Sequence, residues 1–270
     1  MGRGIAEVSA RAGYDVLISE INRELLDRGL AAINASLSRA VERGRATAQE
    51  KAAAESHIKG TTDVNDFRDC DLVIEAVIEN LEVKKKVFAD LDSICPPHAI
   101  LASNTSCLSV MDMAAVTKRL DKVLGIHFMN PVPVMKLVEL VKTIATSDET
   151  ISTARHFSQS VGKTPVTAPD IPGFIVNRVL IAFLLEAIRL YESGQATRED
   201  IDQAVMLGLN HPMGPLTLSD LIGLDTVLFI SNAMYEELKA PQFAAPVLLK
   251  RMVTAGQFGR KSNKGFYDYK

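Results

Sequence analysis

The sequence predicts an α/β protein in which a doubly wound parallel sheet is followed by an all-helical region. Apolar runs of strand length alternate with amphipathic helical segments through the first part of the chain, as in a sheet with helices on both faces. Polar or charged side chains follow each predicted strand. Nothing beyond the proline-rich connector at residues 164–173 has the pattern of a strand. We therefore expect two domains, residues 1–171 and residues 172–270.

Composition excludes several classes of protein. The 270-residue chain is 47% hydrophobic and 23% charged, which is ordinary for a globular protein, and its net charge of −3 argues against a nucleic-acid partner. No apolar stretch is long and charge-free enough to span a bilayer, so we expect no membrane partner. Cys70, Cys95 and Cys107 show no metal-ligand spacing. They predict reduced thiols in a cytoplasmic protein without a metal site.

The N-terminal residues have the pattern of half a nucleotide-binding unit. Residues 2–10 predict a helix that ends near Gly13, and residues 14–20 predict a strand that finishes on Glu20. A helix opening with glycines, followed by a strand that ends in a carboxylate, is the second half of a dinucleotide-binding βαβ unit, although other αβ units share this pattern. Gly2 would be the third glycine of G-x-G-x-x-G. The first strand and the two leading glycines would precede Met1, and we expect a longer reading frame to supply them.

The region from Asn22 to about Gly60 predicts a long amphipathic helical segment. Its polar side is basic, and a solvated surface is the default explanation for such a run of charge. The alternative is a binding surface for the phosphates of a large anionic ligand. The basic residues are Arg23, Arg28, Arg39, Arg43, Arg45 and Lys51.

Three further segments, residues 71–77, 99–106 and 122–128, predict buried parallel strands separated by helices. Together with residues 14–20 they place polar groups at four strand ends. Because ligands bind at the carboxyl edge of an open parallel sheet, these ends predict a ligand site. The polar groups are Glu20, Glu75 to Glu79, Asn104 to Ser106, and His127.

One histidine and one glutamate could form a proton-transfer pair. The chain leaves a strand at His127, turns through two prolines, and returns to Glu139 twelve residues later, which could bring the two side chains together. A carboxylate that accepts one ring N–H fixes the tautomer and raises the basicity of the other nitrogen. A strand-end histidine and an unrelated surface glutamate are the alternative.

Beyond the proline-rich connector at residues 164–173, the pattern is helical. A long helix is expected from Phe174 to Glu192, a capped helix from Thr197, and a break at Gly223. The first of these helices carries an apolar stripe, so we expect a homodimer through this region. The stripe consists of Phe174, Val179, Leu180, Phe183, Leu184 and Ile188.

Several stretches together resemble the L-3-hydroxyacyl-CoA dehydrogenase family, especially its bacterial 3-hydroxybutyryl-CoA dehydrogenases. They occur in the family's order and with the family's spacings along the whole chain, which is more specific than any one motif. The stretches are Met1–Ala6, Glu75–Asn80, Ala102–Ser106, His127–Glu139, Pro172–Arg178, His211–Pro215 and Gly265–Tyr269.

This resemblance implies a Rossmann-type NAD-binding domain followed by a helical domain that dimerises. It implies the reversible, NAD-dependent oxidation of an L-3-hydroxyacyl-CoA to the 3-ketoacyl-CoA. By motif position, His127 would be the general base and Glu139 its orienting carboxylate. Ser106 and Asn177 would hydrogen-bond the reacting oxygen.

The resemblance also implies binding residues and no metal. Glu20 replaces the family's commoner aspartate and keeps its charge. The cofactor residues implied are Gly2, Glu20, Ala76, Glu79, Lys84, Asn104, Ser106, Asn130 and Lys261. The coenzyme A residues implied are Ser36, Arg43 and Ser106.

Two alternatives stay open from the sequence. One is a non-catalytic protein on the same fold, which would have no need for all four of the implied catalytic residues. The other is a lysine-dependent β-hydroxyacid dehydrogenase, whose chemistry needs a lysine where this chain has Asn177 and Arg178. Oxidation of NADH with acetoacetyl-CoA would separate these alternatives from the dehydrogenase.

Overall fold

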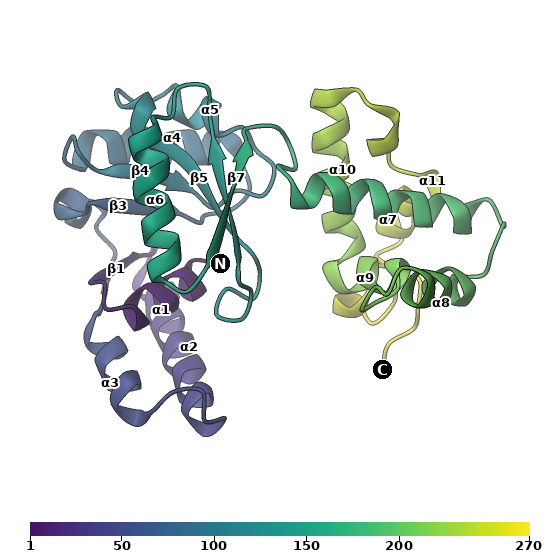
Figure 1. The fold of residues 1–270 in the computed structure, drawn as a ribbon, viewed down its shortest axis with the longest axis horizontal. Coiled ribbons are helices and arrows are strands. Elements are labelled where there is room, and N and C mark those ends of the chain that lie inside the picture. Colours follow the sequence, from purple (N-terminus) through teal and green to yellow (C-terminus); the bar gives the residue numbers. More distant parts are fainter. The chain divides into compact units, whose positions relative to one another are not determined.

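A computed structural model describes all residues, Met1–Lys270. They form two compact units, Met1–Asp170 and Ile171–Lys270 (Figure 1). The helices of the first unit are α1 (Gly2–Arg11), α2 (Arg23–Glu42), α3 (Ala48–Ser56), α4 (Leu81–Ile94), α5 (Val110–Ala114) and α6 (Asp148–Ser160). Its strands are β1 (Val16–Ser19), β2 (Ile58–Thr61), β3 (Leu72–Glu75), β4 (Ile100–Ser103), β5 (Val123–Phe128), β6 (Leu137–Lys142) and β7 (Thr164–Pro169).

The second unit is entirely helical. Its α-helices are α7 (Val176–Glu192), α8 (Arg198–Gly208), α9 (Pro215–Ile222), α10 (Leu224–Leu238) and α11 (Val247–Thr254). The chain also has four short 3₁₀ helices, namely η1 (Val64–Asp69) and η2 (Leu120–Lys122) in the first unit, and η3 (Pro241–Phe243) and η4 (Arg260–Ser262) in the second.

The strands of the first unit form two sheets. One contains β1 and β2, which are parallel, and the other has the order β3-β4-β5-β6-β7. Strands β3, β4 and β5 are parallel, β6 runs antiparallel to β5, and β7 is parallel to β6. The predicted fold class is confirmed, and the carboxyl ends of β3, β4 and β5 meet at one edge, as ligand binding requires.

Helices cover both faces of the five-stranded sheet. On one face, α1 and α6 pack against alternate strand residues that include Ala102, Ile126 and Leu140. The intervening residues face α4 and α5. A Cβ at Gly125 would lie 3.3 Å from Val110 of α5, so this helix approaches β5 closely. Because side chains alternate along a strand, residues 75, 103, 127 and 139 all project to the α4–α5 side.

Helix α1 belongs to two hydrophobic cores. Its Ile5 and Val8 pack in the core of the five-stranded sheet. Its Ala6 and Ala10 pack in a second core with α2, α3 and the β1–β2 pair. The two sheets are therefore joined through the side chains of this helix, while no strand pairing connects them.

The prediction of one helical region from Asn22 to about Gly60 was wrong in detail. Gly44, in a left-handed conformation with φ of 65°, ends the first helix, and a capping box of Thr47 and Glu50 begins the next. Strand β2 then pairs with β1. Its Gly60 lies against Leu26, because a Cβ there would approach the Leu26 side chain to 2.8 Å.

The prediction that residues 164–173 form only a connector was also wrong, because β7 pairs with β6 from Thr164 to Pro169. Strand β7 lies at the edge of the sheet. Proline cannot donate to a strand ladder, so it is tolerated on an edge strand, where its nitrogen need not pair. Pro165 and Pro169 made this segment look like a connector.

The second unit confirms the expected break at Gly223, where φ is 102° and α9 and α10 meet at 94°. No single helix is long and apolar enough to cross a membrane, and only this bent pair would qualify if it were counted together. The predicted apolar stripe needs correction. Leu184, Ile188 and Phe174 are buried within the unit, whereas Val179 is 68% exposed.

Candidate active site

His127 and Glu139 are cross-strand partners on β5 and β6. The antiparallel register places Nδ1 of the imidazole 2.7 Å from Oε2 of the carboxylate. Their side chains are 7% and 1% exposed. The alternative of an unrelated surface glutamate is therefore excluded, and the contact that the spacing suggested is present.

The geometry of this pair allows directed proton transfer. A buried carboxylate accepts hydrogen bonds, so the hydrogen shared by His127 and Glu139 is donated by Nδ1. In that tautomer the lone pair is on Nε2, which is therefore the basic nitrogen of the ring. The carboxylate would also stabilise the imidazolium that results.

The turn between these strands is hydrogen-bonded by a buried lysine, which sequence reasoning did not identify. Lys163 donates from Nζ to the carbonyl oxygens of Val132, at 2.5 Å, and Met135, at 2.9 Å. Burial lowers the pKa of this ammonium. The turn also packs on α1, because a Cβ at Gly4 would lie 2.8 Å from Val132. Asn130, a predicted cofactor residue, lies at the start of this turn.

The loop after β4 is tied to the histidine strand. Asn104 Oδ1 accepts a hydrogen bond from the backbone N–H of Phe128, at 2.9 Å, directly after His127. Two residues further on, the backbone N–H of Ser106 donates to Glu79 Oε1 at 3.0 Å. The loop after β4, which carries the predicted site residues Asn104 and Ser106, therefore lies at the carboxyl edge of the sheet.

A buried charge cluster lies beneath this loop. Lys84 Nζ is 2.8 Å from Glu75 Oε1 and 3.2 Å from Glu79 Oε2, and the Lys84 and Glu75 side chains are each 1% exposed. Sequence reasoning placed Glu75 among the polar groups at the strand ends but did not identify its buried ion pair with Lys84. A signal was present, because Lys84 has the same helical spacing as Phe88 and Leu91, the other buried residues of α4. A lysine in that register predicts a buried partner of opposite charge.

The residues at the sheet edge fit a dinucleotide. A Cβ at Gly2 would lie 3.7 Å from the Cβ of Ala76, so α1 begins beside the end of β3. The N–H groups at a helix start favour a pyrophosphate. Glu20 follows β1 directly, where a carboxylate can accept from ribose hydroxyls. Ser36 lies on α2, and Arg43, which caps it, is exposed.

Two predicted residues belong to the second unit. Asn177 lies in the first turn of α7. Lys261 lies in η4, and its ammonium is 2.5 Å from Asp225 Oδ1. The roles predicted for both residues stay predictions.

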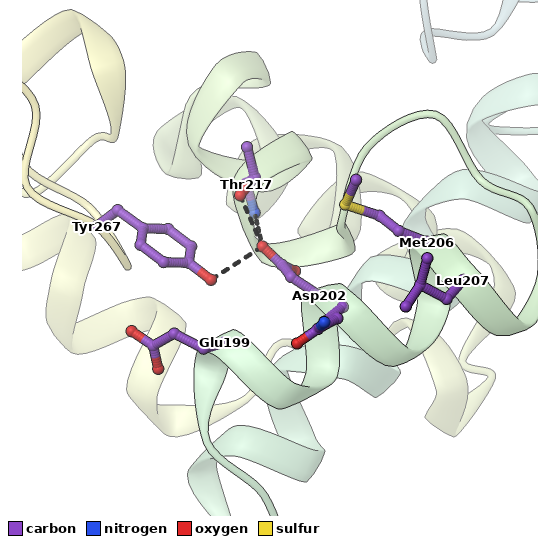
Figure 2. Close-up of a pocket in the computed structure, with 7 residues that line it drawn as sticks. Glu199, Asp202, Met206, Leu207, Thr217 and Tyr267 are labelled. Atoms are coloured by element: carbon purple, nitrogen blue, oxygen red, sulfur yellow. Dashed lines mark hydrogen bonds between the residues drawn. The ribbon is translucent and has the colours of Figure 1, made fainter.

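The second unit has a polar cluster of its own, beside an open hollow of about 420 Å³ (Figure 2). Asp202 Oδ2 accepts from the Thr217 hydroxyl at 2.6 Å and from the Tyr267 hydroxyl at 3.0 Å. The same carboxylate accepts from the N–H groups of Leu216 and Thr217, which begin α9. All of these donors come from its own unit, so the cluster caps a helix and fastens the C-terminal segment.

Comparisons with known proteins cover the whole chain. The family model for the NAD binding domain of 3-hydroxyacyl-CoA dehydrogenase matches residues 1–171, and the model for its C-terminal domain matches residues 173–269. A 3-hydroxybutyryl-CoA dehydrogenase of Mycobacterium tuberculosis is 51% identical over 271 residues, covering 100% of this chain and 95% of that protein. One from Clostridioides difficile is 46% identical over 269 residues, covering 100% and 96%.

Solved structures agree. The crystal structure of Mycobacterium tuberculosis FadB2 has a TM-score of 0.97 at 50% identity and covers 100% of this chain and 95% of that one. The (S)-3-hydroxybutyryl-CoA dehydrogenase PaaH1 of Ralstonia eutropha has a TM-score of 0.98 at 42% identity, with coverage of 100% and 95%.

Proposed function

The chain belongs to the 3-hydroxyacyl-CoA dehydrogenase family, and from this premise we propose that it oxidises L-3-hydroxybutyryl-CoA reversibly to the 3-ketoacyl-CoA with NAD. The observation that carries this proposal is the buried His127–Glu139 pair, at 2.7 Å, on the ligand edge of the sheet. A proton acceptor there is what oxidation of a secondary alcohol needs. A lysine-dependent β-hydroxyacid dehydrogenase would need a lysine in the first turn of α7, and this chain has none there.

The chain's own residues account for the proton. NAD, when bound, supplies the acceptor for the hydride that leaves C3 of the substrate. His127 Nε2 takes the hydroxyl proton, and Glu139 holds the ring and stabilises its positive charge. Ser106 and Asn177 donate hydrogen bonds to the substrate oxygen as it gains alkoxide character. In the reductive direction His127 returns the proton to that oxygen.

We assign the cofactor chiefly to the first unit. Glu20 would accept from the adenosine ribose and repel the 2′-phosphate of NADP, and nearby Arg23 is already paired with Asp27 at 2.9 Å. The coenzyme A moiety would use Ser36, Arg43 and Ser106. The other proposed cofactor residues are Gly2, Ala76, Glu79, Lys84, Asn104, Ser106, Asn130 and Lys261.

We further propose that residues 172–270 form a homodimer of a cytoplasmic enzyme. The support is exposed apolar surface on the helical unit, including Val179, Leu207 and Leu209, at 68%, 76% and 69%. Light scattering of the purified chain at micromolar concentration should give twice the chain mass. A monomer would contradict the proposal.

The decisive experiment is NADH oxidation by the purified chain with acetoacetyl-CoA. The wild-type protein should turn over with NADH in preference to NADPH, and His127→Gln should lower kcat by about 10²- to 10⁴-fold. His98→Gln is the matched control, because His98 is an exposed histidine paired only with Asp71. A folded wild-type protein that binds NADH but leaves acetoacetyl-CoA unreduced would overturn the proposed function.

A further inference from the structure

Glu75 lies at the centre of a hydrogen-bond network that joins four segments of the first unit. Its Oε1 accepts from the Val77 N–H at 2.6 Å and from Lys84 Nζ at 2.8 Å. Its Oε2 accepts from the Ser103 hydroxyl at 2.7 Å. Ser103 Oγ in turn accepts from the N–H of Thr105 at 3.1 Å. One carboxylate thus fixes the end of β3, a side chain of α4, the last residue of β4 and the loop that follows it.

A second path from Glu75 reaches Ser106 through two charges. Lys84 Nζ bridges Glu75 to Glu79 Oε2. The other oxygen of Glu79 accepts from the Thr105 hydroxyl at 2.6 Å and from the Ser106 N–H at 3.0 Å. The position of the Ser106 backbone therefore depends on where the Lys84 ammonium holds Glu79.

We propose that Glu75 is a positioning residue for the reaction, acting through Lys84 and Ser103 to hold the Ser106 loop. The proposal rests on the proposed function for its catalytic consequence. Its structural consequence, the ordering of residues 105 and 106, is independent of that function.

The charge of Glu75 is needed to divide the ammonium between two carboxylates. Lys84 is 1% exposed, so water cannot replace a lost partner. Without a charge at Glu75, the ammonium is attracted to Glu79 alone. It then competes with the Ser106 N–H and the Thr105 hydroxyl for that carboxylate.

Folding alone gives no reason for this carboxylate. The backbone ladder of β3 and β4, from Leu72 opposite Ile100 to Glu75 opposite Ser103, forms without the side chain. Apolar residues of similar volume usually stabilise a core as well as a buried ion pair does. A charged network that ends at a predicted catalytic serine is better explained by positioning.

The test compares Glu75→Gln with Glu82→Gln, a control on α4, the helix that carries Lys84. The Glu82 side chain is 81% exposed. In Glu75→Gln we expect kcat with acetoacetyl-CoA and NADH to fall by about a hundredfold, with both KM values within about threefold of wild type. In the protein without ligands, we expect amide hydrogen exchange of Thr105 and Ser106 to accelerate about tenfold or more. Exchange in β5 should be unchanged, and the control should match wild type.

Ser103→Ala is the second variant, in case Glu75→Gln does not fold. It removes only the hydroxyl link from Glu75 to Thr105, so the same two changes should appear with smaller size. Unchanged exchange at residues 105 and 106 in either folded variant would overturn the proposal. Faster exchange in a chain that is inactive even as wild type would keep the positioning role and instead refute the proposed function.

Discussion

The two units of this molecule both bury carboxylates, but they surround them with different partners. In the first unit, Glu75 meets a lysine ammonium and Glu139 meets an imidazole. In the second, Asp202 and Asp220 meet only backbone N–H groups and hydroxyls. Asp220, for example, accepts from Phe266 N–H at 3.0 Å and from the Tyr269 hydroxyl at 2.9 Å.

The difference separates a site to which we assign proton transfer from a cluster that fastens the C-terminal segment. A partner that can itself carry or lose a proton, such as His127, has a second ring nitrogen that can take part in proton transfer. Partners that are amides and phenols fill the acceptor positions of the carboxylate, and neither gives up a proton near neutral pH. Burial then works against ionisation, which raises the pKa of Asp220 and, with the Asp220 contact, raises the pKa of Tyr269 to about 12.

The largest effect should come from Glu139→Gln. An amide can donate where the carboxylate only accepts, so it no longer selects the productive tautomer or stabilises the imidazolium. We expect kcat to fall by about 10²- to 10⁴-fold, with little change in the affinity for acyl-CoA or in the unfolding temperature. Steady-state kinetics and thermal unfolding measure both, with the exposed Glu149→Gln as control. Near-normal turnover would show that Glu139 has no part in proton transfer, and it would contradict the distinction between the buried carboxylates of the two units.

A smaller effect, on stability alone, should follow Asp202→Ala. The change leaves the N–H groups of Leu216 and Thr217 without their acceptor and frees the Tyr267 hydroxyl. We expect a loss of about 3 kcal/mol in the free energy of unfolding, measured by denaturant titration. The matched control is Glu199→Ala, which lines the same hollow from a mostly exposed position. An equal loss in both variants would show that the cluster is not the fastening point.

The smallest effect should be that of Tyr269→Phe, and it should depend on pH. The Tyr269 hydroxyl lowers the pKa of Asp220, partly offsetting its rise by burial from 3.8, so its removal raises that pKa further. A carboxyl with a folded pKa above its unfolded value loses its stabilising contribution as the pH rises through the folded pKa. The variant should therefore be about 1 kcal/mol less stable near pH 7, with a smaller difference near pH 4. A gap that widens on acidification would contradict this assignment.

Sequence reasoning predicted correctly the features that depend on residues close to one another in the chain. The hairpin from His127 to Glu139 follows from two strand patterns and a turn, and the strand-end loops follow from alternation. The strand at residues 164–169 was missed, because an edge position that tolerates proline cannot be recognised without knowing the order of the sheet.

The charged and hydroxyl partners were missed for a related reason. Glu75 and Ser103 are 28 residues apart, and Asp220 and Tyr269 are 49 apart. No local period connects such pairs, so only the folded chain reveals them. The apolar stripe from Phe174 to Ile188 could not be interpreted from the sequence for the same reason. Its residues look alike in the sequence, but Leu184 and Ile188 are buried in the core of the unit and Val179 is exposed.

The double packing of α1 has a consequence for how the two cores of the first unit respond to change. Its Ile5 and Val8 pack in the core of the five-stranded sheet, and its Ala6 and Ala10 pack with α2, α3 and the β1–β2 pair. Because close-packed interiors transmit strain, a shift of α1 caused by repacking in one core displaces its side chains in the other. The positions of Glu20, after β1, and of His127, on β5, are then coupled through one short helix.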